Sequence, residues 1–165
     1  MEEEILSLEQ KKRIEKCYKH GLEMYAAAKT LYTNPRQTIQ EDAVVTVHAE
    51  CMLMAFACEL FIKTMLYYEN SEKKKIEGHS LKELFDKLSS QTKDTVIDVF
   101  NKAWDCDEDK MYRYLKEITY YFVDLRYMFE KKCKSYILHT DFLFCFGDVL
   151  RWRCKAGKSV WGGCS

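Results

Sequence analysis

Proline is nearly absent from this sequence. A single proline occurs in 165 residues, and three of the six glycines fall within the last nine. Because these two residue types interrupt helices most strongly, the chain can form long helices with few breaks. The alternation of polar and apolar residues that marks strands is almost absent as well. We therefore expect an all-α fold.

An excess of charge of either sign is also lacking. Lys and Arg together number 26, as do Asp and Glu, so no overall positive charge favours a nucleic-acid or membrane surface. The longest apolar run, residues 49–62, contains Glu50 and Glu59 and is too short to span a bilayer. We expect it to be a buried central helix. The acidic start of the chain has no apolar secretion segment, which predicts a cytoplasmic protein without membrane attachment.

Cysteine is frequent, with eight in the chain, but metal-ligand spacing is missing. There is no C-x-x-C motif, and Cys17, Cys51, Cys58 and Cys133 recur on apolar helix positions, where a thiol acts as a small hydrophobe. The pattern favours a reduced compartment without a structural zinc ion. We expect no cofactor.

Helix-capping signals divide the chain. Ser7 with Gln10, Thr38 with Glu41, and Ser80 with Glu83 have the spacing of capping boxes. The pattern predicts helices over residues 7–33, 38–69, 80–88, 90–104, 107–136 and 140–152. We expect one antiparallel bundle of three long helices plus shorter ones over residues 1–154, followed by a flexible tail, 155–165.

Some charged residues fall at the edges of the apolar stripes. Arg126 and Glu130 are spaced for an ion pair on the helix predicted over 107–136, and Glu50 lies near the stripe of the central helix. We predict a contact between Arg126 and Glu50, because a buried carboxylate needs a partner. Two interpretations remain open: a salt bridge that fixes helix register, or a polar groove lined by these residues and Tyr127.

Other polar features favour structural roles. Glu59 and Lys63 have the spacing of an ion pair on the other side of the central helix, either at the surface or at a second interface. His79 precedes a helix start, and neither His48 nor His139 has a catalytic partner at a telling spacing. Basic clusters at 11–13, 73–75 and 131–134 could contact phosphates, and a solvated surface is the simpler account of them.

Three short sequence motifs occur in a familiar order. They are residues 58–66 with Glu59 and Lys63, residues 78–85 with His79, and residues 122–130 with Arg126. Together they resemble the HEPN (higher eukaryotes and prokaryotes nucleotide-binding) domains over roughly residues 40–136. The resemblance implies a helical bundle that often forms homodimers in toxin–antitoxin, abortive-infection and other defence systems.

Many HEPN proteins are metal-independent ribonucleases in which four to six residues separate an arginine from a following histidine. In this chain the corresponding positions after Arg126 are Lys131, Lys132 and Cys133, so this nuclease motif is missing. Arg13 and His20, seven positions apart, are the only pair with the required spacing, but they lie in the first helix. His79 and His20 are the remaining candidates for an acid or base.

Three hypotheses follow. The first is an HEPN-like module that dimerises or binds RNA or a nucleotide, with a cognate antitoxin or defence protein as a further partner. The second is a metal-independent ribonuclease toxin in which Arg126 holds phosphate and His79 or His20 acts as the base. The third is a structural adaptor that binds a partner helix.

Overall fold

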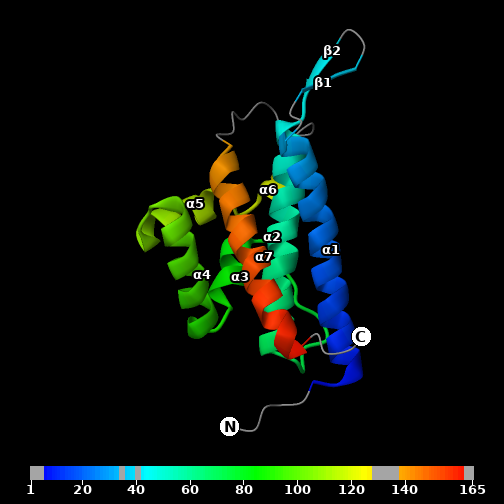
Figure 1. Cartoon of the computed structure of the whole chain (residues 1–165), viewed down its shortest axis with the longest axis vertical. Helices are drawn as coiled ribbons and strands as arrows, with labels where there is room; N and C mark the ends of the chain where they lie inside the picture. Colours follow the sequence, from blue (N-terminus) through cyan, green and yellow to red (C-terminus); the bar gives the residue numbers. More distant parts are fainter. Residues whose placement is uncertain (1–5, 34–35, 40–41, 128–137, 162–165) are drawn as a thin grey trace.

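The computed structural model describes residues 6–33, 36–39, 42–127 and 138–161. Within them the chain forms an all-α bundle with one short hairpin, as Figure 1 shows. The long helices are α1 (Leu8–Thr33), α2 (Val47–Glu69) and α7 (Thr140–Trp161). The shorter ones are α3 (Leu81–Asp86), α4 (Ser90–Trp104), α5 (Glu108–Ile118) and α6 (Tyr121–Arg126).

The three long helices lie side by side, but they are not all antiparallel. α1 runs opposite to α2 and α7, whereas α2 and α7 run in the same direction (Figure 1). The reason lies in the connection, because α3 to α6 carry the chain back to the end of the bundle where α2 begins. The predicted bundle is therefore correct in class. Its third long helix is α7, whereas the sequence pattern assigned that length to residues 107–136.

α2 is the centre of the core, as its apolar sequence predicts. It contacts α1, α3, α6 and α7, and its residues Cys51, Met54, Cys58, Phe61 and Ile62 are fully buried. A helix that is apolar on most sides must be covered on most sides. The surrounding helices provide that cover.

Local capping fixes most helix starts. Ser7 and Gln10 exchange backbone and side-chain hydrogen bonds ahead of α1. Ser80, Ser89 and Asp107 each accept a hydrogen bond from a backbone N–H in the first turn of α3, α4 and α5. These contacts satisfy donors that a helix start leaves open. The predicted starts of these four helices are confirmed.

The predicted helix start at Thr38 is wrong. Residues 36–45 instead form a hairpin in which β1 (Arg36–Ile39) pairs antiparallel with β2 (Asp42–Val45). α2 begins at Val47, with Thr46 at its N-cap position. The segment is rich in β-branched residues, which favour extended backbone, so a nonhelical pairing prevails over the capping-box spacing.

The helix predicted over 107–136 is interrupted after Ile118. Thr119 is bound by the start of α3: its carbonyl accepts the Leu81 N–H at 3.2 Å, and its Oγ1 accepts the Lys82 N–H at 2.8 Å. The chain then resumes as the separate helix α6. Of the rest of the predicted helix, residues 128–137, which include Glu130, lie outside the described residues.

The last helix is longer than predicted. α7 continues to Trp161, so the expected boundary between domain and tail at residues 154 and 155 falls inside it. Its apolar run packs on α2, where the Cys154 thiol donates to the Phe61 carbonyl at 3.4 Å. None of the helices in the described part of the chain is long and apolar enough to cross a membrane.

Candidate functional site

Glu59 is the buried centre of a polar contact between α2 and the loop that follows it. Its side chain is 2% exposed, and its Oε1 lies 2.8 Å from the Lys63 Nζ. The His79 Nδ1 lies 3.1 Å from each of the two carboxylate oxygens. A buried carboxylate needs such partners to offset the loss of water. The expected ion pair between Glu59 and Lys63 is present, but Glu59 is buried and does not lie at the surface.

The surroundings of Glu59 determine which nitrogen of His79 carries the proton. A carboxylate can only accept hydrogen bonds. The His79 Nδ1 is then the donor, and the lone pair of the neutral ring lies on Nε2. Because the His79 side chain is 55% exposed, the ring remains accessible to a ligand. A carboxylate and an imidazole in this arrangement can act as a general base.

Two neighbours of His79 in the chain hold it in place. Gly78 has a φ of +101°, a left-handed conformation that favours glycine. On the other side, the Ser80 Oγ accepts the Glu83 N–H and contacts the Thr119 Oγ1 at 3.1 Å. The turn and the cap together direct His79 back towards α2.

Aromatic rings extend this site to α1 and α6. The Phe122 ring of α6 stacks on the Phe56 ring of α2, with centroids 4.3 Å apart. The His79 ring lies 6.0 Å from Phe122, and the His20 ring of α1 meets Phe56 edge-on at 5.4 Å. The Arg126 Cζ lies 4.9 Å from the Phe122 centroid. We call this set the Phe122 cluster: His20, Phe56, Glu59, Lys63, His79, Phe122 and Arg126.

Arg126 is exposed and held between rings. Besides the Phe122 contact, its Cζ lies 4.6 Å from the centroid of Tyr127, which is 39% exposed. Aromatic contacts occupy the faces of a guanidinium and leave its N–H edge available. No carboxylate pairs with Arg126 among the residues that the structure describes. The predicted pair with Glu130 lies outside those residues.

Glu50 does not join this site, so the predicted Glu50–Arg126 contact is wrong. Glu50 is buried in the first turn of α2, and its Oε2 has no hydrogen-bond partner among the described residues. Burial raises the pKa of its carboxyl group. Arg126 instead follows Phe122, which packs further along α2 at Phe56.

Arg13 and His20 do not converge either. Arg13 binds the Lys73 carbonyl at 2.8 Å and the Glu9 carboxylate at 3.1 Å, and its Cζ lies 5.9 Å from the Tyr67 ring centroid. His20 contacts Phe56, eleven positions earlier on α2. The structure therefore places His20, but not Arg13, in the Phe122 cluster.

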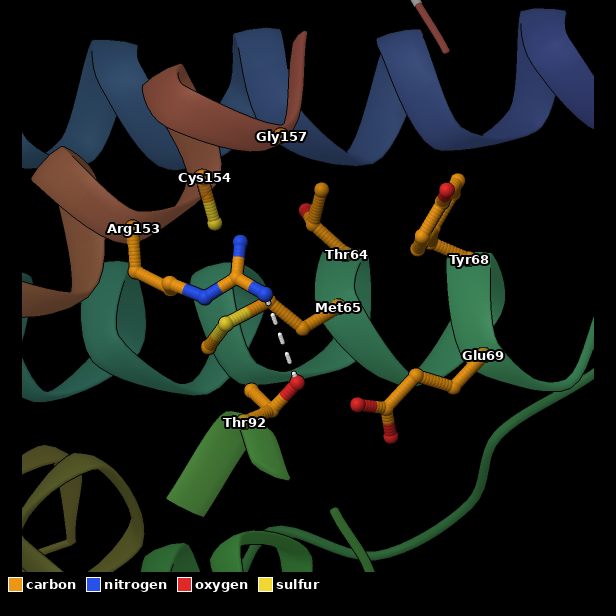
Figure 2. Close-up of a pocket in the computed structure, with 8 residues that line it drawn as sticks. All are labelled: Thr64, Met65, Tyr68, Glu69, Thr92, Arg153, Cys154 and Gly157. Atoms are coloured by element: carbon orange, nitrogen blue, oxygen red, sulfur yellow. Dashed lines mark hydrogen bonds between the residues drawn. The ribbon is translucent and has the colours of Figure 1, made fainter. Parts of the chain in front are cut away.

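A small hollow lies elsewhere, between α2, α4 and α7 (Figure 2). Arg153 extends into it and donates to the Thr92 Oγ1 at 3.5 Å, while the carboxylate of Glu69 accepts the Ser89 N–H and hydroxyl. The cavity volume is about 20 Å³, which is room for a single water molecule. No predicted site residue lines this hollow, and its size suits a bridging water better than a substrate.

His139 has the structural role predicted for it. Its Nε2 contacts the Glu117 carboxylate, and its backbone N–H donates to the Tyr121 hydroxyl at 3.2 Å. These contacts tie the start of α7 to α5 and α6. In the described ranges, no group of three or more His, Cys, Asp and Glu side chains is arranged to hold a metal ion.

The sequence reasoning missed the contact between Glu59 and His79 and the two phenylalanines that join it to Arg126. Gly78 before His79, followed by the Ser80 cap, was an available signal of a fixed histidine. Comparisons with protein-family models, curated proteins and solved structures find no match to this chain. What the structure itself defines is an all-α bundle with a polar site beside α2.

Proposed function

We propose that this chain is an HEPN-like module that binds RNA or a nucleotide through the Phe122 cluster. The observation that carries the proposal is the position of Arg126, stacked on Phe122 and Tyr127 beside His79. A guanidinium fixed by its faces presents its N–H edge for bidentate contact with phosphate. Exposed aromatic and guanidinium planes also accept unstacked bases.

The setting that accompanies this proposal comes from the family resemblance. It comprises the cytoplasm, a homodimer, and a prokaryotic defence or toxin–antitoxin system with a cognate partner protein. A structural adaptor is the alternative if no nucleic acid binds.

The first test measures binding of labelled single-stranded RNA by fluorescence anisotropy. We expect Arg126→Ala to weaken binding about tenfold, because it removes a charge-assisted contact with phosphate. Arg113→Ala is the matched control, since Arg113 is an exposed arginine on α5 with its Cζ 5.7 Å from the Tyr114 ring centroid. Equal affinities for the wild type and Arg126→Ala would contradict the proposal.

The Glu59–His79 contact favours a second candidate function, metal-independent cleavage of RNA. The His79 Nε2 would remove the proton of a 2′-hydroxyl, and the 2′-oxygen would attack the adjacent phosphorus. The bond from phosphorus to the 5′-oxygen would then break, and that oxygen would take a proton from solvent. The products are a 2′,3′-cyclic phosphate and a 5′-hydroxyl, with Arg126 stabilising the charge on phosphorus.

Cleavage is tested with end-labelled RNA in the presence of a chelator. We expect His79→Ala to lower the cleavage rate by about 100-fold or more, because it removes the general base. His48→Ala is the control, since His48 is an exposed histidine in the first turn of α2. If the wild-type protein leaves RNA intact, the second function is excluded and the binding proposal remains open to its own test.

A further inference from the structure

The two basic triplets of the sequence lie next to each other in the structure, although about 60 residues separate them. The Gln10 side-chain amide donates to the Ser71 carbonyl at 2.9 Å, and the Arg13 guanidinium donates to the Lys73 carbonyl at 2.8 Å. The start of α1 and the end of α2 lie at the same end of the bundle (Figure 1). We call this surface the basic seam: Lys11, Lys12, Arg13, Lys73, Lys74 and Lys75.

The loop of residues 70–79 connects the basic seam to the Phe122 cluster. After α2 ends, this loop turns back alongside the helix: the Ile76 N–H donates to the Tyr67 hydroxyl at 3.1 Å, and His79 reaches Glu59. Glu69 and Glu59 are ten residues apart on α2, which corresponds to about 15 Å. The seam and the cluster are thus the two ends of one exposed path.

Positive charge is concentrated at the seam end of this path. Residues 7–20 contain five Lys and Arg against two Glu, and residues 70–79 contain three Lys against two Glu, in a chain whose opposite charges balance. Arg13 pairs with Glu9, and Lys75 pairs with Glu77. In the described part of the chain, the other four seam lysines, Lys11, Lys12, Lys73 and Lys74, have no carboxylate partner. They are available to a polyanion.

We propose that single-stranded RNA follows this path, with one nucleotide at the Phe122 cluster and the adjoining strand on the basic seam. The inference rests on the proposed function and adds to it a strand of several nucleotides as the ligand. A flexible strand can follow a loop along a helix, and tyrosines beside cations suit it, because bases stack on rings while phosphates meet the charges. Tyr67 lies along the path, and the neighbouring Tyr68 is 37% exposed.

The test compares RNA strands of two lengths, two and twelve nucleotides, by fluorescence anisotropy. The wild type should bind the longer strand more tightly. In the double variant Lys73→Gln/Lys74→Gln, affinity for the longer strand should fall about tenfold, with affinity for the shorter strand unchanged. The slope of log affinity against log salt concentration should also become shallower by about 1.4, because the variant removes two lysines that each neutralise one phosphate of a single strand.

A control variant, Lys102→Gln/Lys116→Gln, removes two exposed lysines from α4 and α5 and should behave as the wild type. An unchanged length preference in Lys73→Gln/Lys74→Gln would overturn the inference. The inference would also be overturned if the wild-type protein sediments with phosphatidylserine vesicles but binds neither RNA strand, because the seam would then be a lipid-binding surface. If Arg126→Ala leaves RNA affinity unchanged while Lys73→Gln/Lys74→Gln weakens binding of the longer strand, the result would contradict the proposed nucleotide site and would support RNA binding at the basic seam.

Discussion

Two buried carboxylates on α2 show how strongly individual surroundings decide the role of a residue. Glu59 has a lysine and a histidine within 3.1 Å, whereas Glu50 has one oxygen without a partner among the described residues. Both residues break an apolar run. The sequence placed Glu50 correctly near the buried stripe, but it assigned Glu59 to the outer side. With apolar residues on every face of this helix, no single outer face can be identified from periodicity.

Glu50 is buried, and its Oε2 has no hydrogen-bond partner among the described residues. We therefore expect the stability of the fold to depend on pH. Burial raises the pKa of the Glu50 carboxyl group above the ordinary 4.5, so the folded state binds this proton more tightly than the unfolded state. The resulting stabilisation is complete below about pH 4.5 and is lost as pH rises through the raised pKa. The side chain of Glu50→Gln stays neutral. We therefore expect its free energy of unfolding at pH 7 to be about 1 kcal/mol higher than that of the wild type.

Urea unfolding at pH 7 and pH 4 measures this difference, which should nearly vanish at the lower pH. Glu23→Gln, at an exposed position on α1, is the control and should change little at either pH. A Glu50→Gln protein that is less stable than the wild type at pH 7 would show that the carboxylate contributes favourably there.

At the scale of elements, the close approach of α7 to α2 depends on Gly147. A Cβ atom at this position would lie 2.5 Å from the Met54 sulfur, and Met54 is fully buried. We expect Gly147→Ala to destabilise the fold by about 1–3 kcal/mol, because overpacking opposes the better helix propensity of alanine.

Chemical denaturation of Gly147→Ala in two backgrounds isolates this contact. In a Met54→Ala background the new methyl group no longer meets the Met54 sulfur, so the same change should cost less than in the wild type. An identical cost in both backgrounds would mean that the contact with Met54 does not limit the approach of the helices.

The predictable elements were those whose boundaries are set locally. α1, α3, α4 and α5 begin directly after a capping residue that satisfies N–H groups of its own helix. These residues are Ser7, Ser80, Ser89 and Asp107. The break after Ile118 depends instead on hydrogen bonds from the start of α3 to Thr119. A periodic pattern contains no information about so distant a partner.

At the scale of the whole molecule, the candidate site was partly predictable. The ribonuclease hypothesis already combined His79 with Arg126, and the structure places both beside Phe122. Glu59, which was assigned to the opposite side of α2, contacts His79 instead. Their common centre could not be predicted, because Phe122 looks like one more core residue in the sequence. Periodicity also gave no sign that loop 70–79 folds back along α2.

The position of α2 at the centre of the bundle has a consequence for synthesis of the chain. α1 is made first and can cover one side of α2 at once, but α7 begins about 70 residues after α2 ends. At ribosomal rates of about 5–20 residues per second, the side of α2 that α7 will cover therefore stays open for several seconds. During that interval the nascent chain presents the kind of apolar surface that chaperones bind.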